Sequence, residues 1–407
     1  MFSKIILALW TGAGLVWWIL AWRLVAADQR KSGLISNATA RRTLSVFKPL
    51  PPLGATGLNT VSAGIESFVA QLDPESELLL GIHEADRDFT APFLKRLLAD
   101  YPEARIKVVF RSEPDDVANP KIAWQKILAR QAGGELWLWS DADIVAPTGF
   151  LQSARLEFAR SGATMVTFPY VIHEIPSPPA LLEALFVNVE FYPGVLLLRK
   201  LGPVDFGLGA AMLFQRDDFL QRVDWNEIGS WLADDFFLGQ KLRPVRIGTT
   251  TLATVAGAST WKDAVLHDLR WTKTIRWNRP LGSFARILIM PVLGWLGAVA
   301  LHPSHFFAWI GLLGMIQADV LFAAAICRRA GCRLKLGNML SMEVWSLWRI
   351  LLWFLCWLPW PIPWSGKMWR GPRVKFSREI NHQNQTKRTE AVDKTRRKTD
   401  LFGNKGN

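Results

Sequence analysis

The sequence of 407 residues contains few cysteines, tyrosines and histidines, with three, three and six of them respectively. Cys327, Cys332 and Cys356 show no C-x-x-C spacing and have no group of histidines beside them. This pattern excludes a disulfide framework and a zinc site of the usual spacing. It agrees with a reducing, cytosolic setting for the soluble part of the chain.

Tryptophan, in contrast, is abundant, with 21 residues, and 50% of the sequence is hydrophobic. Indole rings combine an apolar body with a polar N–H group, and they collect where a membrane meets water. We interpret nine of the tryptophans as such interface residues, with core packing as the alternative for each: Trp17, Trp18, Trp22, Trp345, Trp348, Trp353, Trp357, Trp360 and Trp364. The composition therefore indicates one soluble domain joined to membrane-embedded helices.

An almost wholly apolar segment at residues 5–20 is extended by Ala21 and Trp22 to nearly the length that spans a bilayer. A signal peptide is the alternative, but no clear small-residue cleavage site follows. The basic residues near this segment are concentrated after it, at Arg23, Arg30, Lys31, Arg41 and Arg42. The positive-inside rule then places the following domain in the cytoplasm.

From about residue 43 to residue 257, short runs rich in β-branched and aromatic residues alternate with longer amphipathic segments. We expect strands at 45–48, 78–82, 106–110, 136–139 and 165–168, and helices at 92–98, 123–132 and 149–160. This alternation predicts an α/β domain with a mostly parallel sheet. Because functional residues of such sheets lie at the carboxyl ends of the strands, Glu84, Asp86 and Asp141 are candidate site residues.

The C-terminal part is again apolar. Residues 287–301 and 306–326 predict a membrane hairpin, whereas residues 344–364 contain Arg349 and three prolines, which favours a re-entrant or interfacial segment. We expect four regions: a transmembrane anchor at 1–25, a cytoplasmic domain at 43–280, membrane-embedded helices at 281–364 and a basic, disordered tail at 365–407.

The tail accounts for much of the net charge of +13, because residues 367–405 contain twelve basic and four acidic side chains. Basic residues directly after a membrane segment bind an anionic membrane surface, so we expect that partner and no nucleic acid. A solvated tail without a specific partner is the alternative.

Two pairs of acidic residues are candidates for chemistry. Asp141 and Asp143 follow the apolar run 136–139, and their carboxylates suit Mg²⁺ or Mn²⁺ bound to a diphosphate. Asp234 and Asp235 open an expected helix, where one carboxylate can accept a proton from an attacking hydroxyl. Capping of a turn is the alternative for the first pair, and stabilisation of a helix N-terminus is the alternative for the second.

A basic pattern precedes the C-terminal apolar region. Arg270, Lys273 and Arg276 recur at helical spacing beside Trp271, and one such helix face suits a diphosphate. A juxtamembrane basic helix with tryptophan anchors is the alternative.

The sequence from about residue 45 to residue 280 resembles the ceramide glucosyltransferase family, including its bacterial branch with the hopanoid-pathway glycosyltransferases. The segments that carry the resemblance are Ser45-Val46-Phe47-Lys48-Pro49-Leu50, Asn119-Pro120-Lys121, Trp139-Ser140-Asp141-Ala142-Asp143, Phe168-Pro169-Tyr170-Val171, Ala233-Asp234-Asp235-Phe236-Phe237 and Arg270-Trp271-Thr272-Lys273. The resemblance implies a GT-A fold, a UDP-sugar donor, a divalent metal and inversion at the anomeric carbon by direct displacement.

The resemblance also implies roles for single residues. Asp141 and Asp143 would bind the metal and the UDP-sugar, and Asp235, beside Asp234, would be the base. The remaining implied site residues are Arg270 and Trp271 at the diphosphate and acceptor, Lys121 near the nucleotide, and Glu84 or Asp86 at the uracil. The sequence departs from the family's (Q/R)-x-x-R-W motif at its first position, where His267 stands.

The expected function is transfer of glucose or N-acetylglucosamine from a UDP-sugar to the hydroxyl of a membrane lipid such as ceramide or a hopanoid. The expected place is the cytoplasmic face of a bacterial inner membrane. A processive polysaccharide synthase is the first alternative, although it needs more crossing helices than this sequence offers. A catalytically silent membrane scaffold with a basic tail is the second.

Overall fold

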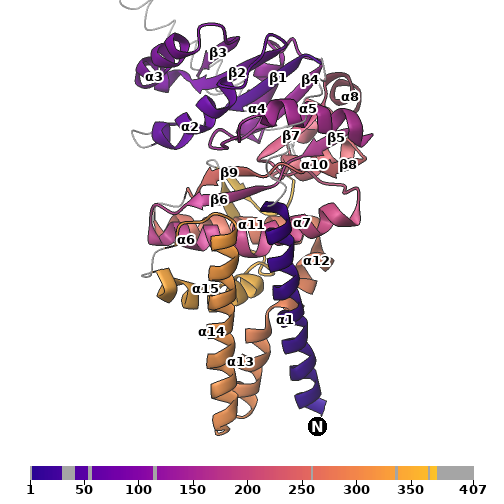
Figure 1. Cartoon of the computed structure of the whole chain (residues 1–407), viewed down its shortest axis with the longest axis vertical. Coiled ribbons are helices and arrows are strands. Elements are labelled where there is room, and N and C mark those ends of the chain that lie inside the picture. Colours follow the sequence, from indigo (N-terminus) through magenta and orange to yellow (C-terminus); the bar gives the residue numbers. More distant parts are fainter. Residues whose placement is uncertain are drawn as a thin grey trace, which may run out of the picture.

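The computed structural model describes residues 2–29, 42–53, 57–112, 117–257, 260–334, 338–364 and 367–373. The expected tail lies outside the described residues from position 374 onward. An α/β domain stands above a layer of helices that lies across the long axis of the molecule (Figure 1). Three helices continue from that layer along the long axis: α1 (Phe2–Gln29), α13 (Pro291–Leu301) and α14 (Phe306–Arg329).

The main sheet has seven strands among the described residues, in the order β3-β2-β1-β4-β7-β5-β8. These strands are β1 (Leu44–Pro49), β2 (Ser76–His83), β3 (Ile106–Arg111), β4 (Leu136–Ser140), β5 (Met165–Thr167), β7 (Ala211–Gln215) and β8 (Val245–Ile247). Neighbours run parallel except at β7, which is antiparallel to both β4 and β5. The expected α/β fold is confirmed, and β7 is a strand that the sequence pattern does not reveal.

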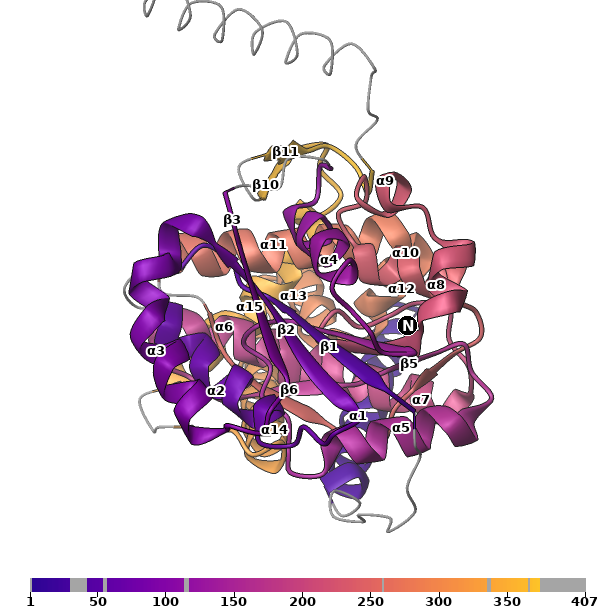
Figure 2. The same cartoon turned by 90° about the horizontal axis from the view of Figure 1, so that it is seen from above.

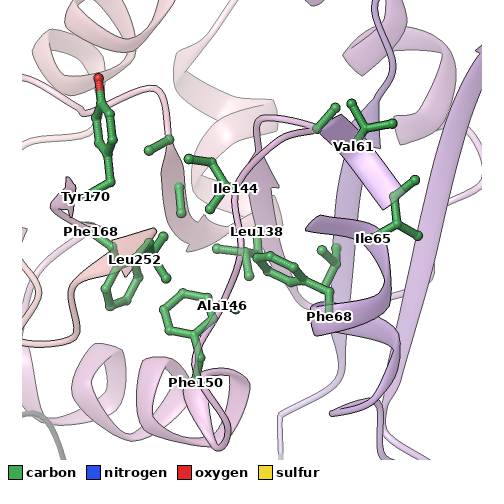
Figure 3. Packing of buried hydrophobic residues seen from close by; sticks show 14 of the residues in the cluster. Val61, Ile65, Phe68, Leu138, Ile144, Ala146, Phe150, Phe168, Tyr170 and Leu252 are labelled. Atoms are coloured by element: carbon green, nitrogen blue, oxygen red, sulfur yellow. The ribbon is translucent and has the colours of Figure 1, made fainter. Parts of the chain in front are cut away.

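Helices cover both faces of this sheet (Figure 2). They are α2 (Gly57–Val69), α3 (Arg87–Asp100), α4 (Pro120–Ala129), α5 (Phe150–Ser161), α8 (Arg216–Arg222), α9 (Trp225–Ile228) and α10 (Asp234–Lys241). Val46 and Leu138 belong to the core that α2, α3 and α5 close, part of which Figure 3 shows. Phe47 and Trp139, the next residues along the same strands, belong to the core under α4, α8 and α10. Burial on both faces fixes β1 and β4, so the loops at their carboxyl ends start from defined positions.

The crosswise layer lies between the α/β domain and the helices of the long axis (Figure 1). It contains the parallel pair β6 (Tyr170–Glu174) and β9 (Leu252–Val255) and the helices α6 (Pro178–Leu185), α7 (Tyr192–Leu201) and α11 (Trp261–Asn278). A π-helical segment, Phe186–Phe191, joins α6 to α7. The α11 helix begins at a capping box, in which Thr260 Oγ1 accepts from the Asp263 amide and the Asp263 carboxylate accepts from the Thr260 amide.

Three helical stretches in the described part of the chain are long and apolar enough to cross a membrane: Lys4–Asp28, Pro178–Leu201 and Phe306–Arg329. A fourth is possible if Pro280–Ile289 and Pro291–Leu301, which meet at 68°, form one broken span. The Pro178–Leu201 stretch lies in the crosswise layer, and 67% of its most apolar window is buried within the protein. Its hydrophobicity is therefore explained largely by internal packing.

The C-terminal region begins with α12 (Pro280–Ala285) and ends with α15 (Asn338–Leu355), β10 (Ile362–Trp364) and β11 (Lys367–Trp369). Asp319 of α14 accepts two hydrogen bonds from Arg349 of α15, at 2.8 and 2.9 Å, and both side chains are buried. Since a buried charge is tolerated only when it is paired, this contact holds α15 against α14. The re-entrant or interfacial placement of residues 344–364 stays a prediction.

Candidate active site

The first acidic pair lies where the pattern of strands places it. Asp141 directly follows β4, and its amide donates to the Ala210 carbonyl at 3.2 Å. Ala210 belongs to the loop before β7, the strand that pairs with β4. The Asp141 loop is therefore bound to a segment about seventy residues further along the sequence.

Lys121 provides a positive charge between the two acidic pairs. Its Nζ lies 2.6 Å from Asp141 Oδ1 and 3.7 Å from Asp234 Oδ2, and it donates to the Gly209 carbonyl at 3.4 Å. Lys121 stands in the first turn of α4, which Asn119 caps by accepting from the Lys121 amide at 3.0 Å. Burial opposes a charge on Lys121, but Asp141 and Asp234 together raise its pKa above the ordinary value.

Asp235 is held by backbone amides. Its Oδ2 accepts from the Gly209 amide at 3.0 Å, and its Oδ1 accepts from the Phe236 amide at 2.7 Å. The Gly207 amide donates to the Asp235 carbonyl at 2.9 Å. One short loop before β7 therefore binds both Asp235 and, through Ala210, Asp141.

Gly209 marks the point where these groups converge. A Cβ atom at this position would lie 3.4 Å from Asp235 Oδ2, 3.6 Å from Lys121 Nζ and 3.8 Å from Asp141 Oδ2. Residues from three separate segments thus surround the small volume that Gly209 leaves open. We call Lys121, Asp141, Asp234 and Asp235 the acidic centre.

The environment of Asp235 changes its acidity. Burial, followed by the negative charge of the neighbouring Asp234, raises the pKa of Asp235 to about 6. Lys121 and the two amide donors act in the opposite direction. A carboxylate with a pKa near neutrality is suited to take up a proton during a reaction and to release it afterwards.

Asp143 contacts the small sheet formed by β6 and β9. The Thr254 hydroxyl of β9 donates to Asp143 Oδ2 at 2.7 Å, which joins the loop after β4 to the small sheet. Burial, and then the charge of Asp141, raise the pKa of Asp143. The two carboxylates of the D-x-D pair therefore have different partners, Lys121 for Asp141 and Thr254 for Asp143.

Lys48 is a site residue to which the sequence pattern assigns no role. It is fully buried, and its Nζ donates to the carbonyls of Asp141 and Ile144 at 2.8 and 3.1 Å. Burial lowers the pKa of Lys48 to about 7, although Asp143 and Asp141 favour its charged form. A lysine within a buried and mostly apolar strand is the signal that could have identified it.

Arg270 and Trp271 of α11 point to different surroundings. The charge of Arg270 interacts with Tyr170, Glu183, Asp141 and Asp235, while burial lowers its pKa. Trp271 instead lies among aromatic rings, 5.7 Å from both Phe186 and Phe191 and 6.4 Å from Tyr170. Arg270 is thus electrostatically linked to the acidic centre, whereas Trp271 packs in the crosswise layer beneath it.

Three other residues of the motifs make contacts away from the acidic centre. Glu84 is exposed and pairs with Arg87, and Asp86 accepts from the Leu53 amide at 2.8 Å. Both follow β2, at the same edge of the sheet as Asp141, but among the described contacts none joins them to the acidic centre. His267 Nε2 lies 3.6 Å from Glu183 Oε1, and its ring centre lies 5.2 Å from that of Trp271, with the two rings tilted by 35°.

The carboxylates of Asp141 and Asp143 are the candidate ligands of a divalent metal. Among the described residues, no three His, Cys, Asp or Glu side chains gather into a complete ligand set. Mg²⁺ is, however, usually held by one or two carboxylates, with substrate phosphates and water completing its shell. The Asp141 side chain is 39% exposed and can offer an oxygen, so Asp141 and Asp143 fit such a site.

The family of this chain is shown by its match to a sequence model of known proteins. The sequence model of glycosyl transferase family 21 matches residues 8–378, which is most of the chain. The chain belongs to glycosyl transferase family 21. This family membership confirms the resemblance to the ceramide glucosyltransferase family. As a member of family 21, the protein is a glycosyltransferase that uses a nucleotide sugar.

Solved structures show more distant similarity to this family 21 protein. The mannosyltransferase PcManGT from Pyrobaculum calidifontis, in complex with GDP-Man and Mn²⁺, is 16% identical, with a TM-score of 0.48 over 86% of this chain and 99% of that chain. S. aureus TarS 1–349, in complex with UDP-GlcNAc, is 12% identical, with a TM-score of 0.37 over 83% and 97%. No curated protein matches the chain.

Proposed function

We propose that this protein transfers glucose or N-acetylglucosamine from a UDP-sugar to the hydroxyl of a membrane lipid such as ceramide or a hopanoid. The reaction inverts the anomeric carbon and takes place at the cytoplasmic face of a bacterial inner membrane. The observation that carries the proposal is the convergence of Asp141, Asp235 and Lys121 around Gly209.

In this reaction, Asp235 is the general base. Its carboxylate accepts the proton of the lipid hydroxyl while the hydroxyl oxygen attacks the anomeric carbon. The bond between that carbon and the diphosphate oxygen breaks, and UDP leaves. The pKa of Asp235, raised to about 6, supports this role because the group is largely ionised at neutral pH yet basic enough to take the proton.

Lys121 and Arg270 stabilise the charge that develops on the leaving diphosphate. Asp141 and Asp143 would hold a divalent ion, which neutralises part of that charge when it is bound. Asp234 adds a negative charge next to Lys121, since its Oδ2 lies 3.7 Å from Lys121 Nζ. Glu84 or Asp86 contacts the uracil from the loop after β2.

Exposed apolar side chains next to α11 support a lipid acceptor. Leu281 and Phe284 of α12 and Leu288 after it are 84%, 57% and 57% exposed. In a soluble protein such side chains would lie in water, but the helices α1, α13 and α14 extend from this same side of the protein (Figure 1). A membrane on this side brings a water-insoluble acceptor close to the crosswise layer.

The proposal is tested with the full-length chain in lipid vesicles that contain ceramide or a hopanoid. The vesicles are incubated with radiolabelled UDP-glucose, UDP-N-acetylglucosamine and other UDP-sugars, and labelled lipids are identified by mass. We expect one labelled lipid that carries a single added hexose or N-acetylhexosamine. Label found only in a long polymer, or only in free sugar, would contradict the proposal.

A further inference from the structure

The chain returns to the α/β domain after its last long helix. Lys367 Nζ donates to the Ala118 carbonyl at 3.0 Å, and the Leu232 amide donates to the Pro372 carbonyl at 3.0 Å. Arg373 Nε donates to Ser230 Oγ at 2.9 Å. Residues 367–373 therefore pack against the α/β domain. We expected them to belong to a disordered tail, and the structure differs from that expectation for these seven residues.

The returning segment is a small antiparallel hairpin made of β10 and β11, which we call the C-terminal hairpin. Trp369 is its anchor, since its side chain is 0% exposed and packs with Ala118 and Leu232. Trp364 stacks edge-on with Trp369, with ring centres 5.9 Å apart. Figure 2 shows the hairpin beside the N-terminal end of α4.

The two loops that Trp369 joins both lead into the acidic centre. Ala118 precedes Asn119, the cap of the helix that carries Lys121. Leu232 stands two residues before Asp234 in the sequence. Asn119 joins these loops directly by donating to the carbonyls of Gly229 and Trp231, and Trp369 adds an apolar contact to both of them.

A third contact reaches α11. Lys273 Nζ donates to the carbonyls of Leu358 and Trp360, at 2.7 Å each, so the segment before the hairpin is tied to this helix. One turn earlier on α11, the guanidinium of Arg270 lies 6.0 Å from the centre of the Trp364 ring. This distance is at the outer limit of a cation–π contact, so the ring is the aromatic neighbour of this guanidinium.

We propose that Trp364 is a positioning residue for Arg270, and that the C-terminal hairpin completes the transfer centre by joining the Lys121 loop, the Asp234 loop and α11. The inference rests on the proposed function, because it takes Arg270 to meet the diphosphate. A long arginine side chain loses rotational freedom when it is fixed. Fixing it in advance places its charge where the leaving group becomes negative.

The test compares three variants of the full-length chain, purified in detergent: Trp364→Ala, Trp364→Phe and Trp360→Ala. Trp360 is the matched control, because it is 54% exposed in the same segment and contributes to Lys273 only its backbone carbonyl. We expect Trp364→Ala to lower kcat roughly tenfold with little change in the donor KM, as for an interaction made in the transition state. Trp364→Phe should recover most of the rate, and Trp360→Ala should match the wild type.

Wild-type kcat in Trp364→Ala, or equal losses in the alanine and phenylalanine variants, would overturn the role of Trp364 while leaving the proposed function intact. Failure of the wild type to transfer sugar from any donor would instead contradict the proposed function.

Hydrogen exchange provides a readout that does not depend on activity. Trp369→Ala should speed exchange at the Leu232 amide, which is bonded to Pro372, and Trp369→Phe should do so less. Unchanged exchange in Trp369→Ala would overturn the role of the hairpin.

Discussion

The ammonium group of Lys121 forms an ion pair of 2.6 Å with Asp141. These residues come from different elements, since Lys121 lies in α4 and Asp141 follows β4. The pair places a cation of the protein beside the carboxylate that is expected to bind a metal. The free protein thus carries part of the positive charge that a diphosphate needs.

Removal of that charge should weaken donor binding. For Lys121→Gln we expect the donor KM to rise about 10- to 100-fold, which corresponds to the 1.5–3 kcal/mol of a hydrogen bond to a charged group. Lys126→Gln on the same helix is the control, because Lys126 lines a surface hollow with Arg130 and Trp137 instead. Steady-state kinetics with UDP-sugar measures both, and an equal KM for the two variants would contradict the role of Lys121.

Activity should decrease in acid with the titration of Asp235. A base acts as its carboxylate, so lowering the pH through the pKa of about 6 protonates Asp235 and should reduce kcat/KM about tenfold per pH unit below it. Asp234→Asn removes a charge that raises this pKa and should move the acidic limb of the profile to lower pH. A profile that is flat between pH 5 and 8 (roughly the range where a perturbed carboxylate titrates) would exclude Asp235 as the base.

Lys48 should support the loop that carries the D-x-D pair. Lys48→Met leaves the carbonyls of Asp141 and Ile144 without their buried donor, at a cost of about 1–3 kcal/mol. We expect a lower thermal midpoint in detergent together with weaker donor binding. Lys95→Met on α3 is the control, because the Lys95 side chain is exposed. A Lys48→Met variant that melts and binds like the control would show that the loop does not depend on Lys48.

Sugar transfer should depend on a divalent metal ion. Excess chelator should abolish transfer, and Mn²⁺ or Mg²⁺ should restore it. Asp143→Asn should raise the metal concentration needed for half-maximal rate, since it removes one of the two carboxylates that we propose as ligands. Turnover that continues unchanged in chelator would take the metal out of the mechanism.

Much of the fold follows from the sequence for a simple physical reason. The strands β1, β2, β4 and β5 are mostly apolar runs buried in the core, and β3 is a β-rich run at the edge of the sheet, so the local sequence predicts all five within a few residues. The run Ala211–Gln215 forms β7 but contains alanine, methionine and leucine, which are strong helix formers. Its strand conformation comes from pairing with β4 and β5, a tertiary effect that a local pattern does not contain.

The site was predictable in its parts but not in its assembly. Asp141 and Asp235 were candidates from their positions after a strand and before a helix. Their approach depends on Gly209 and Ala210, which belong to the loop before the unexpected strand β7. The contact of Trp364 with Arg270 could not be predicted, because the basic composition of the following residues is typical of a tail.

The central claim is that Asp235 takes the proton of the acceptor within one centre that also binds the donor. The most direct measurement compares turnover and UDP-sugar binding in Asp235→Asn, a variant that keeps the shape of the side chain. We expect turnover to fall at least about 100-fold, the contribution of a general base, while the dissociation constant of the donor changes little. Donor binding that collapses together with turnover, or turnover that persists, would contradict this account.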